Sequence, residues 1–100
     1  NSFSIPESVF VNKAYAIRSS DKSDDALLQT ISILKKGLTI HDNSAELLHE
    51  TSIYILLNKN FVEAQAHHKK ALKNELNSNN KLKYIMEFNS VHKKVSAEDM

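Results

Sequence analysis

Apolar side chains recur at helical spacing along most of this chain. Phe10, Ala14 and Ile17 fall at positions i, i+4 and i+7, which places them on one face of a helix. The leucines and isoleucines within 27–38 and 47–57 continue this kind of spacing. No segment shows sustained alternation of apolar and polar residues with the period of two that is typical of a β-strand. We therefore predict an all-α fold with five helices, at about 5–19, 24–38, 44–58, 60–75 and 80–95.

Polar breaks that contain capping residues separate the predicted helices. Ser23 precedes two aspartates and Ser44 precedes a glutamate two positions on, so each serine can accept a hydrogen bond from a free amide of a first turn. Ser4 and Glu7 have the spacing of a capping box, with Pro6 in the first turn, where its missing N–H does no harm. The one glycine and one proline are too few for the turns of a many-stranded β fold.

Two short sequence motifs are each repeated after the same number of residues. The tetrapeptide KKGL at 35–38 returns as KKAL at 69–72, and the dipeptide NS at 43–44 returns at 77–78, so both are repeated after 34 residues. A repeat of this length indicates a helix–turn–helix unit that must stack on a neighbouring unit to bury its apolar face.

At this period the chain resembles the tetratricopeptide repeat. The copy at 45–78 carries the resemblance through the bulky and small residues of its two helices, namely Leu48, Ser52, Ile55, Phe61, Ala64, Ala71 and Leu72. The first copy needs about four extra residues near 19–23, and the third copy has only its first helix. Lys13 and Thr51 stand at usual leucine positions, Lys59 stands at the usual turn glycine, and there is no closing proline. The resemblance, which covers most of 6–92, implies about two and a half antiparallel repeats, a right-handed α-solenoid fragment in a single domain spanning 1–100.

In that family the first helices line a concave groove that holds a partner peptide or helix. The family branch that clamps a carboxylate uses lysine, asparagine and arginine, but Val11, Tyr15 and Glu50 occupy three of those positions here. The resemblance thus implies an apolar or amphipathic partner segment, although Leu57 can equally belong to the core. The implied groove residues are Val11, Tyr15, Arg18, His49, Ile53, Leu57, Lys83 and Glu87.

The last predicted helix has two apolar stripes. Its wheel places Leu82, Ile85, Met86 and Asn89 on one side, which we expect to pack on the preceding hairpin. The opposite stripe would then face outward, and another protein surface would have to bury it, because a terminal helix of a repeat protein requires a polar outer face. We expect a homodimer interface, or another partner, on the stripe made of Tyr84, Phe88, Val91 and Val95.

Composition narrows the class of protein. With 41% hydrophobic and 25% charged residues, the chain is typical of one small soluble domain. It has no cysteine and no apolar run of the ~18 residues that a membrane span needs, and we expect a cytoplasmic protein without a signal segment. Because it begins with Asn1, we expect a fragment of a longer protein. The net charge is +1, and the lysines between 69 and 94 lack the arginines and dense basic stripe typical of nucleic-acid binding.

No motif predicts catalysis or a metal centre. Glu46 and His49 are three residues apart and Glu63 and His67 are four apart, whereas a carboxylate-bridged metal bundle needs two Glu-x-x-His pairs and two further glutamates. No strained nucleophile turn is present. We expect a non-catalytic adaptor or scaffold, without cofactor or metal, that binds a protein segment. The alternatives are a structural or oligomerisation domain and, more weakly, a nucleic-acid-binding domain.

Overall fold

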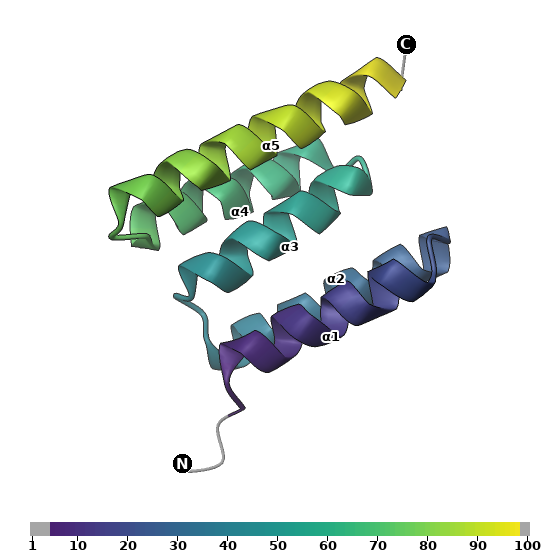
Figure 1. The fold of residues 1–100 in the computed structure, drawn as a ribbon, viewed down its shortest axis with the longest axis horizontal. Helices are drawn as coiled ribbons and strands as arrows, with labels where there is room; N and C mark the ends of the chain where they lie inside the picture. Colours follow the sequence, from purple (N-terminus) through teal and green to yellow (C-terminus); the bar gives the residue numbers. More distant parts are fainter. Residues whose placement is uncertain (1–4, 99–100) are drawn as a thin grey trace.

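The computed structural model describes residues 5–98, and this part of the chain is all helical. Its helices are α1 (Glu7–Ser20), α2 (Asp24–Ile40), α3 (Ala45–Leu57), α4 (Phe61–Asn74) and α5 (Ser78–Glu98) (Figure 1). None of the described residues lies in a β-strand. The all-α prediction is confirmed, and each helix starts and stops within three residues of its predicted bounds.

Four helices begin at polar side chains that cap them, including α5, where Asn77 accepts from the Asn80 amide at 3.0 Å. The Ser23 hydroxyl accepts from the Ala26 amide at 3.2 Å, and the Ser44 hydroxyl accepts from the Leu47 amide at the same distance. Asn60 caps α4 in the same way. These bonds satisfy amides that have no carbonyl partner inside the helix.

The start of α1 differs from the prediction. Pro6 is the residue that precedes the helix, not a residue of its first turn, and it provides no side-chain cap. Ser4, the predicted partner of Glu7 in a capping box, lies outside the described residues.

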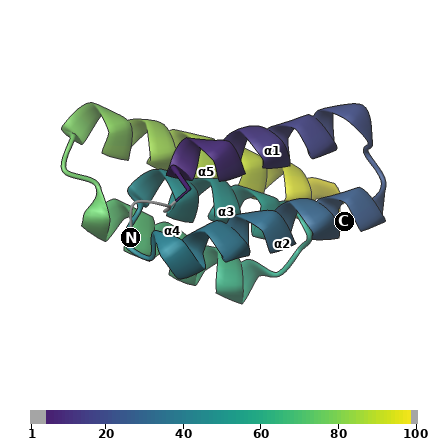
Figure 2. The same cartoon turned by 90° about the horizontal axis from the view of Figure 1, so that it is seen from below.

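The helices form two layers. Figures 1 and 2 show α1, α3 and α5 in one layer, here called the front layer, and α2 and α4 behind them in the back layer. α1 and α2 form one antiparallel hairpin and α3 and α4 form a second, with α3 packing on α2 and α5 packing mainly on α3. The result is a slab with extents of 49 × 32 × 20 Å.

The apolar core runs from the first hairpin to α5 in two clusters. The first joins Phe10, Ala14, Leu34 and Leu47. The second is made of buried side chains from four helices, namely Leu27, Ile31, Ile55, Leu56, Ala64 and Phe88. Tyr54 is packed against both clusters and so links them.

α1 and α2 approach each other closely at Gly37. A Cβ atom on this residue would lie 2.8 Å from Cγ and 3.0 Å from Cβ of Phe10. These atoms stand near the Phe10 backbone, so the ring cannot avoid the new methyl group by a simple rotation. Gly37 is buried, as is Ala71, its counterpart in the 34-residue repeat. Position 37 therefore requires a residue without a side chain, and its counterpart in the second hairpin is also small.

We expect Gly37→Ala to destabilise the protein, although alanine is the better helix former. The propensity gain is about 1 kcal/mol, whereas overpacking a core contact costs about 1–3 kcal/mol. Urea unfolding followed by circular dichroism should therefore give a lower free energy of unfolding for Gly37→Ala. The matched control Lys36→Ala changes an exposed neighbour and should stay within about 0.5 kcal/mol of wild type. A more stable Gly37→Ala protein would contradict the close approach.

The orientation predicted for the last helix is wrong. Tyr84, Phe88 and Val95 are buried, and Val91 is half-buried against the second core cluster. The stripe that was expected to pack inward is exposed instead, namely Leu82, Ile85, Met86 and Asn89. The expected dimer interface through Tyr84, Phe88, Val91 and Val95 is therefore an internal contact of the chain.

Two histidines explain why α5 packs this way round. The ring of Tyr84 stacks on His49 of α3 with centroids 4.1 Å apart, and Phe88 stacks on His68 of α4 with centroids 4.0 Å apart. The Tyr84 hydroxyl donates a hydrogen bond to Glu75 at 3.0 Å, so its polar end is satisfied. The inward stripe carries the aromatic rings, whereas the outward stripe contains Asn89. Inward packing thus buries the aromatic rings of α5 and leaves the Asn89 amide on the exposed side of the helix.

Candidate functional site

A pocket of about 350 Å³ opens between α3 and α5 in the front layer. Residues four apart on a helix share a face, and the lining contains three such pairs: His49 with Ile53, Met86 with Ser90, and Glu87 with Val91. α3 contributes His49, Glu50 and Ile53. α5 contributes Met86, Glu87, Ser90 and Val91. The pocket therefore combines two carboxylates with apolar walls.

His49 and Glu87 join the two helices at this pocket. Nε2 of His49 lies 2.6 Å from Oε1 of Glu87, and the imidazole is only 1% exposed. Burial is the larger effect and lowers the pKa of His49, while the hydrogen bond to Glu87 opposes it. The ring is therefore neutral near pH 7, and Nε2–H donates to the carboxylate. His49 thus holds the Glu87 carboxylate in position without neutralising its charge.

Glu50 is the second carboxylate of the pocket. Burial raises its pKa first, and repulsion from Glu87 and Glu46 raises it further. Lys83 acts in the opposite direction with a smaller effect. Glu50 and Glu87 are therefore close enough for their carboxylates to repel each other at the α3–α5 pocket.

The front layer continues from the pocket towards α1. Burial raises the pKa of Tyr54, and the charges of Glu50, Arg18 and Tyr15 act on the same phenol. These side chains of α1 and α3 are therefore within electrostatic range of one another. Tyr15 is 67% exposed, which leaves its ring accessible to solvent.

The predicted groove residues divide into three groups. His49, Ile53 and Glu87 line the α3–α5 pocket, and Lys83 lies close enough to influence the pKa of His49. Tyr15 and Arg18 lie towards Tyr54, as described above. The structure places the other two predicted residues, Val11 and Leu57, half-buried against the core clusters.

Sequence reasoning missed part of the pocket. Glu50 was considered only as a departure from a carboxylate clamp, and Met86 was assigned to the inward side of α5. Met86, Ser90 and Val91 line the pocket together with Glu87, and Ser90 and Val91 follow Glu87 by three and four residues, the spacing of one helix face. That spacing was a signal in the sequence, but it pointed to the pocket only after the orientation of α5 was known.

The other histidine–glutamate pair makes local contacts. Nδ1 of His67 donates to the backbone carbonyl of Glu63 at 2.9 Å, and the Glu63 carboxylate pairs with Lys35 at 2.7 Å. Within 5–98, no group of three histidine, aspartate or glutamate side chains is arranged to hold a metal ion.

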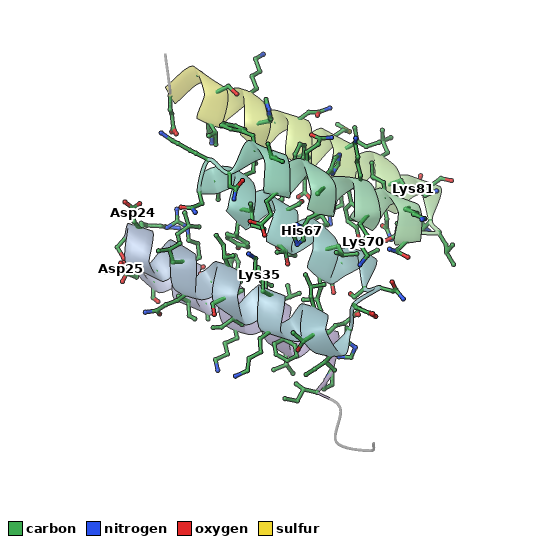
Figure 3. The ribbon with its side chains drawn as sticks, turned by 180° about the vertical axis from the view of Figure 1, so that it is seen from behind. Asp24, Asp25, Lys35, His67, Lys70 and Lys81 are labelled. Carbon is green, nitrogen blue, oxygen red and sulfur yellow. The ribbon has the colours of Figure 1, made fainter. Side chains whose placement is uncertain are left out.

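Lysine side chains lie on the opposite side of the molecule, together with Asp24 and Asp25 at the start of α2 (Figure 3). Figure 3, which views the slab from behind, shows Lys35, His67 and Lys70 on the side formed by α2 and α4. A second, shallower pocket of about 400 Å³ on α4 is lined by Lys69, Lys70 and Lys73 together with asparagines. The carboxylates of the α3–α5 pocket and these lysines therefore belong to different faces.

No helix in the described part of the chain has the length and apolar character needed to cross a membrane. In comparisons with protein-family models, with curated proteins and with solved structures, the chain has no match.

Proposed function

We propose that this chain is a non-catalytic protein-interaction module built from about two and a half helix–turn–helix repeats of the tetratricopeptide type, arranged as a right-handed solenoid fragment. The 34-residue offset supports this assignment, because it relates the last turns of α2 to the last turns of α4. The buried small residues Gly37 and Ala71 occupy equivalent places in the two hairpins. The layered order of α1, α3 and α5 supports a shared binding face.

The observation that carries the proposal is the α3–α5 pocket. It lies on the front layer, it has apolar walls, and Glu50, Glu87 and Ser90 add a few polar groups. Its volume falls within the range of about 300–1,000 Å³ of ordinary ligand sites. Exposed Tyr15 extends the face beyond the pocket. Such a face suits an extended or helical segment of a partner protein.

A selection from a displayed library of random linear peptides tests this function. Wild-type protein should enrich peptides whose binding is lost when Met86, 62% exposed in the pocket wall, is changed to aspartate. Tyr15→Asp should weaken the same peptides. Each anchor removed should cost at least about tenfold in affinity. Ile53→Asp is a poorer test, because Ile53 is packed against the core.

Val62→Asp is the matched control for that selection. Val62 is 84% exposed on α4 in the back layer, so its substitution also places a charge at an exposed apolar position. Peptides that bind this variant as well as wild type, but not Met86→Asp, would support the front-layer groove. Equal loss in both variants, or enrichment of no peptide, would contradict it.

An alternative function draws on another part of α5. Leu82 and Ile85 are exposed apolar residues outside the pocket lining, and a structural or oligomerisation domain of a larger protein would use such a surface. Failure of the peptide selection, together with self-association that depends on Leu82 and Ile85, would favour this function over the first.

A further inference from the structure

The α3–α5 pocket is charged as well as apolar, and its charge is unbalanced. Among the described residues, the partner of Glu87 is the neutral imidazole of His49, and no lysine or arginine forms an ion pair with Glu50. The like charge of Glu46 also acts on Glu50, and Lys83 compensates for it only in part. Apart from the His49 bond to Glu87 and the nearby charge of Lys83, the carboxylates therefore depend on solvent for stabilisation.

A ligand that binds in such a pocket displaces water from the carboxylates, and the free energy of this desolvation depends on the charge of the ligand. A partner segment that packs on Ile53 and Met86 removes water from Glu50 and Glu87. Desolvating a carboxylate without a compensating charge or hydrogen bond is strongly unfavourable. A cationic side chain offsets this cost, because it pairs with the carboxylates and reduces their mutual repulsion. A neutral or acidic segment does not compensate for the desolvation free energy of the carboxylates.

The geometry around Glu87 also favours a positively charged donor. Its Oε1 accepts the bond from His49, while Oε2 accepts no hydrogen bond within 5–98. The stacked and buried His49 ring fixes the position of this carboxylate. Arginine presents several donors in a planar fork that matches carboxylates, and lysine presents a compact charge with three donors.

We propose that the α3–α5 pocket binds an arginine or lysine side chain of a partner peptide, with an adjacent apolar residue on Ile53 and Met86. The carboxylates of Glu50 and Glu87 receive the cationic group. This assignment deepens the proposed interaction function and rests on it. The partner is therefore a protein segment in which a basic residue stands beside apolar ones.

Three matched peptides test the charge preference directly. The probes are Leu-Arg-Leu, Leu-Gln-Leu and Leu-Glu-Leu, each with an acetylated N-terminus and an amidated C-terminus, titrated into the whole chain. Methyl resonances of Ile53, Met86 and Val91 report occupancy of the pocket. The arginine peptide should shift these resonances saturably. The glutamine peptide should bind at least about tenfold more weakly than the arginine peptide, and the glutamate peptide should cause no shift.

Two variants separate charge from shape. Glu50→Gln combined with Glu87→Gln keeps the side-chain size and an oxygen that can accept the His49 bond, so the pocket should persist. The double variant should bind the arginine peptide only as weakly as wild type binds the glutamine peptide. Glu98→Gln, at the end of α5 and outside the pocket lining, should leave the affinity unchanged.

The results that overturn this inference differ from those that overturn the proposed function. Equal binding of the arginine and glutamine peptides, or full arginine-peptide binding by the double variant, overturns the charge preference and leaves the peptide groove standing. Absence of shifts at Ile53 and Met86 with all three peptides also overturns this inference. The library selection decides the peptide groove independently, through its dependence on Met86.

Discussion

Replacing Phe88 with alanine should lower the free energy of unfolding by about 3–5 kcal/mol, the range for deleting a buried aromatic side chain. Phe88 is 3% exposed, stacks on His68 and belongs to the core cluster that joins α2, α3, α4 and α5. Its removal leaves a cavity at the place where α5 is attached. Urea unfolding followed by circular dichroism measures the loss, and Phe88→Leu provides a milder variant that should still fold.

Leu82→Ala is the control, because it distinguishes the two possible orientations of α5. Leu82 is 56% exposed, so its truncation should change the free energy of unfolding by about 0.5 kcal/mol or less. The opposite ranking, in which Leu82→Ala destabilises more than Phe88→Ala, would mean that α5 packs through its other stripe.

Acidification below about pH 6.5 should destabilise the protein through two buried imidazoles. Burial is the main cause that lowers the pKa of His49 and of His68 from the ordinary value of 6.5. For His49, the hydrogen bond and charge of Glu87 oppose the effect of burial, and the charge of Lys83 adds to it. For His68, the nearby His49 lowers the pKa further. In this range the unfolded chain binds protons that the folded chain resists, so stability falls as the pH falls. The slope is at most about 1.4 kcal/mol per pH unit for each imidazole.

The measurement is a series of urea unfolding curves at pH values from about 7.5 to 5. Stability should be nearly constant above pH 6.5 as far as these two groups are concerned, and it should decline below that value. The variant His49→Gln with His68→Gln removes both imidazoles and should flatten the decline, although its stability at pH 7 will also be lower. A wild-type curve without this decline, or a double variant that retains it in full, would contradict the account.

The local structure follows closely from the sequence. Each helix is encoded by its own apolar spacing, and Ser23 and Ser44 encode the starts of α2 and α3 through bonds to amides three residues on. The requirement for a small residue at Gly37 is also visible, because the repeat places Ala71 at the equivalent position. Lys59, in the short turn between α3 and α4, adopts a left-handed backbone with φ of 66°. These features depend on residues that are near one another in the chain.

The orientation of α5 depends on residues that are far apart in the chain. Both of its stripes are apolar, and helical spacing alone gives no reason to prefer one of them. The observed orientation of α5 is favoured by His49 and His68, which lie on other helices and whose rings stack on Tyr84 and Phe88. The pocket follows from that choice, because Met86 and Val91 line it only in the observed orientation. Three of its members, His49, Ile53 and Glu87, are among the predicted groove residues.

The central claim is that the front layer binds a partner segment through the α3–α5 pocket. The most direct measurement is hydrogen–deuterium exchange of the whole chain with and without a peptide enriched in the library selection. Binding should slow exchange in α3 and α5 around Ile53 and Met86, while the exposed side of α4 around Val62 and Lys69 remains unchanged. Protection confined to α2 and α4, with none in α3 or α5, would contradict the claim.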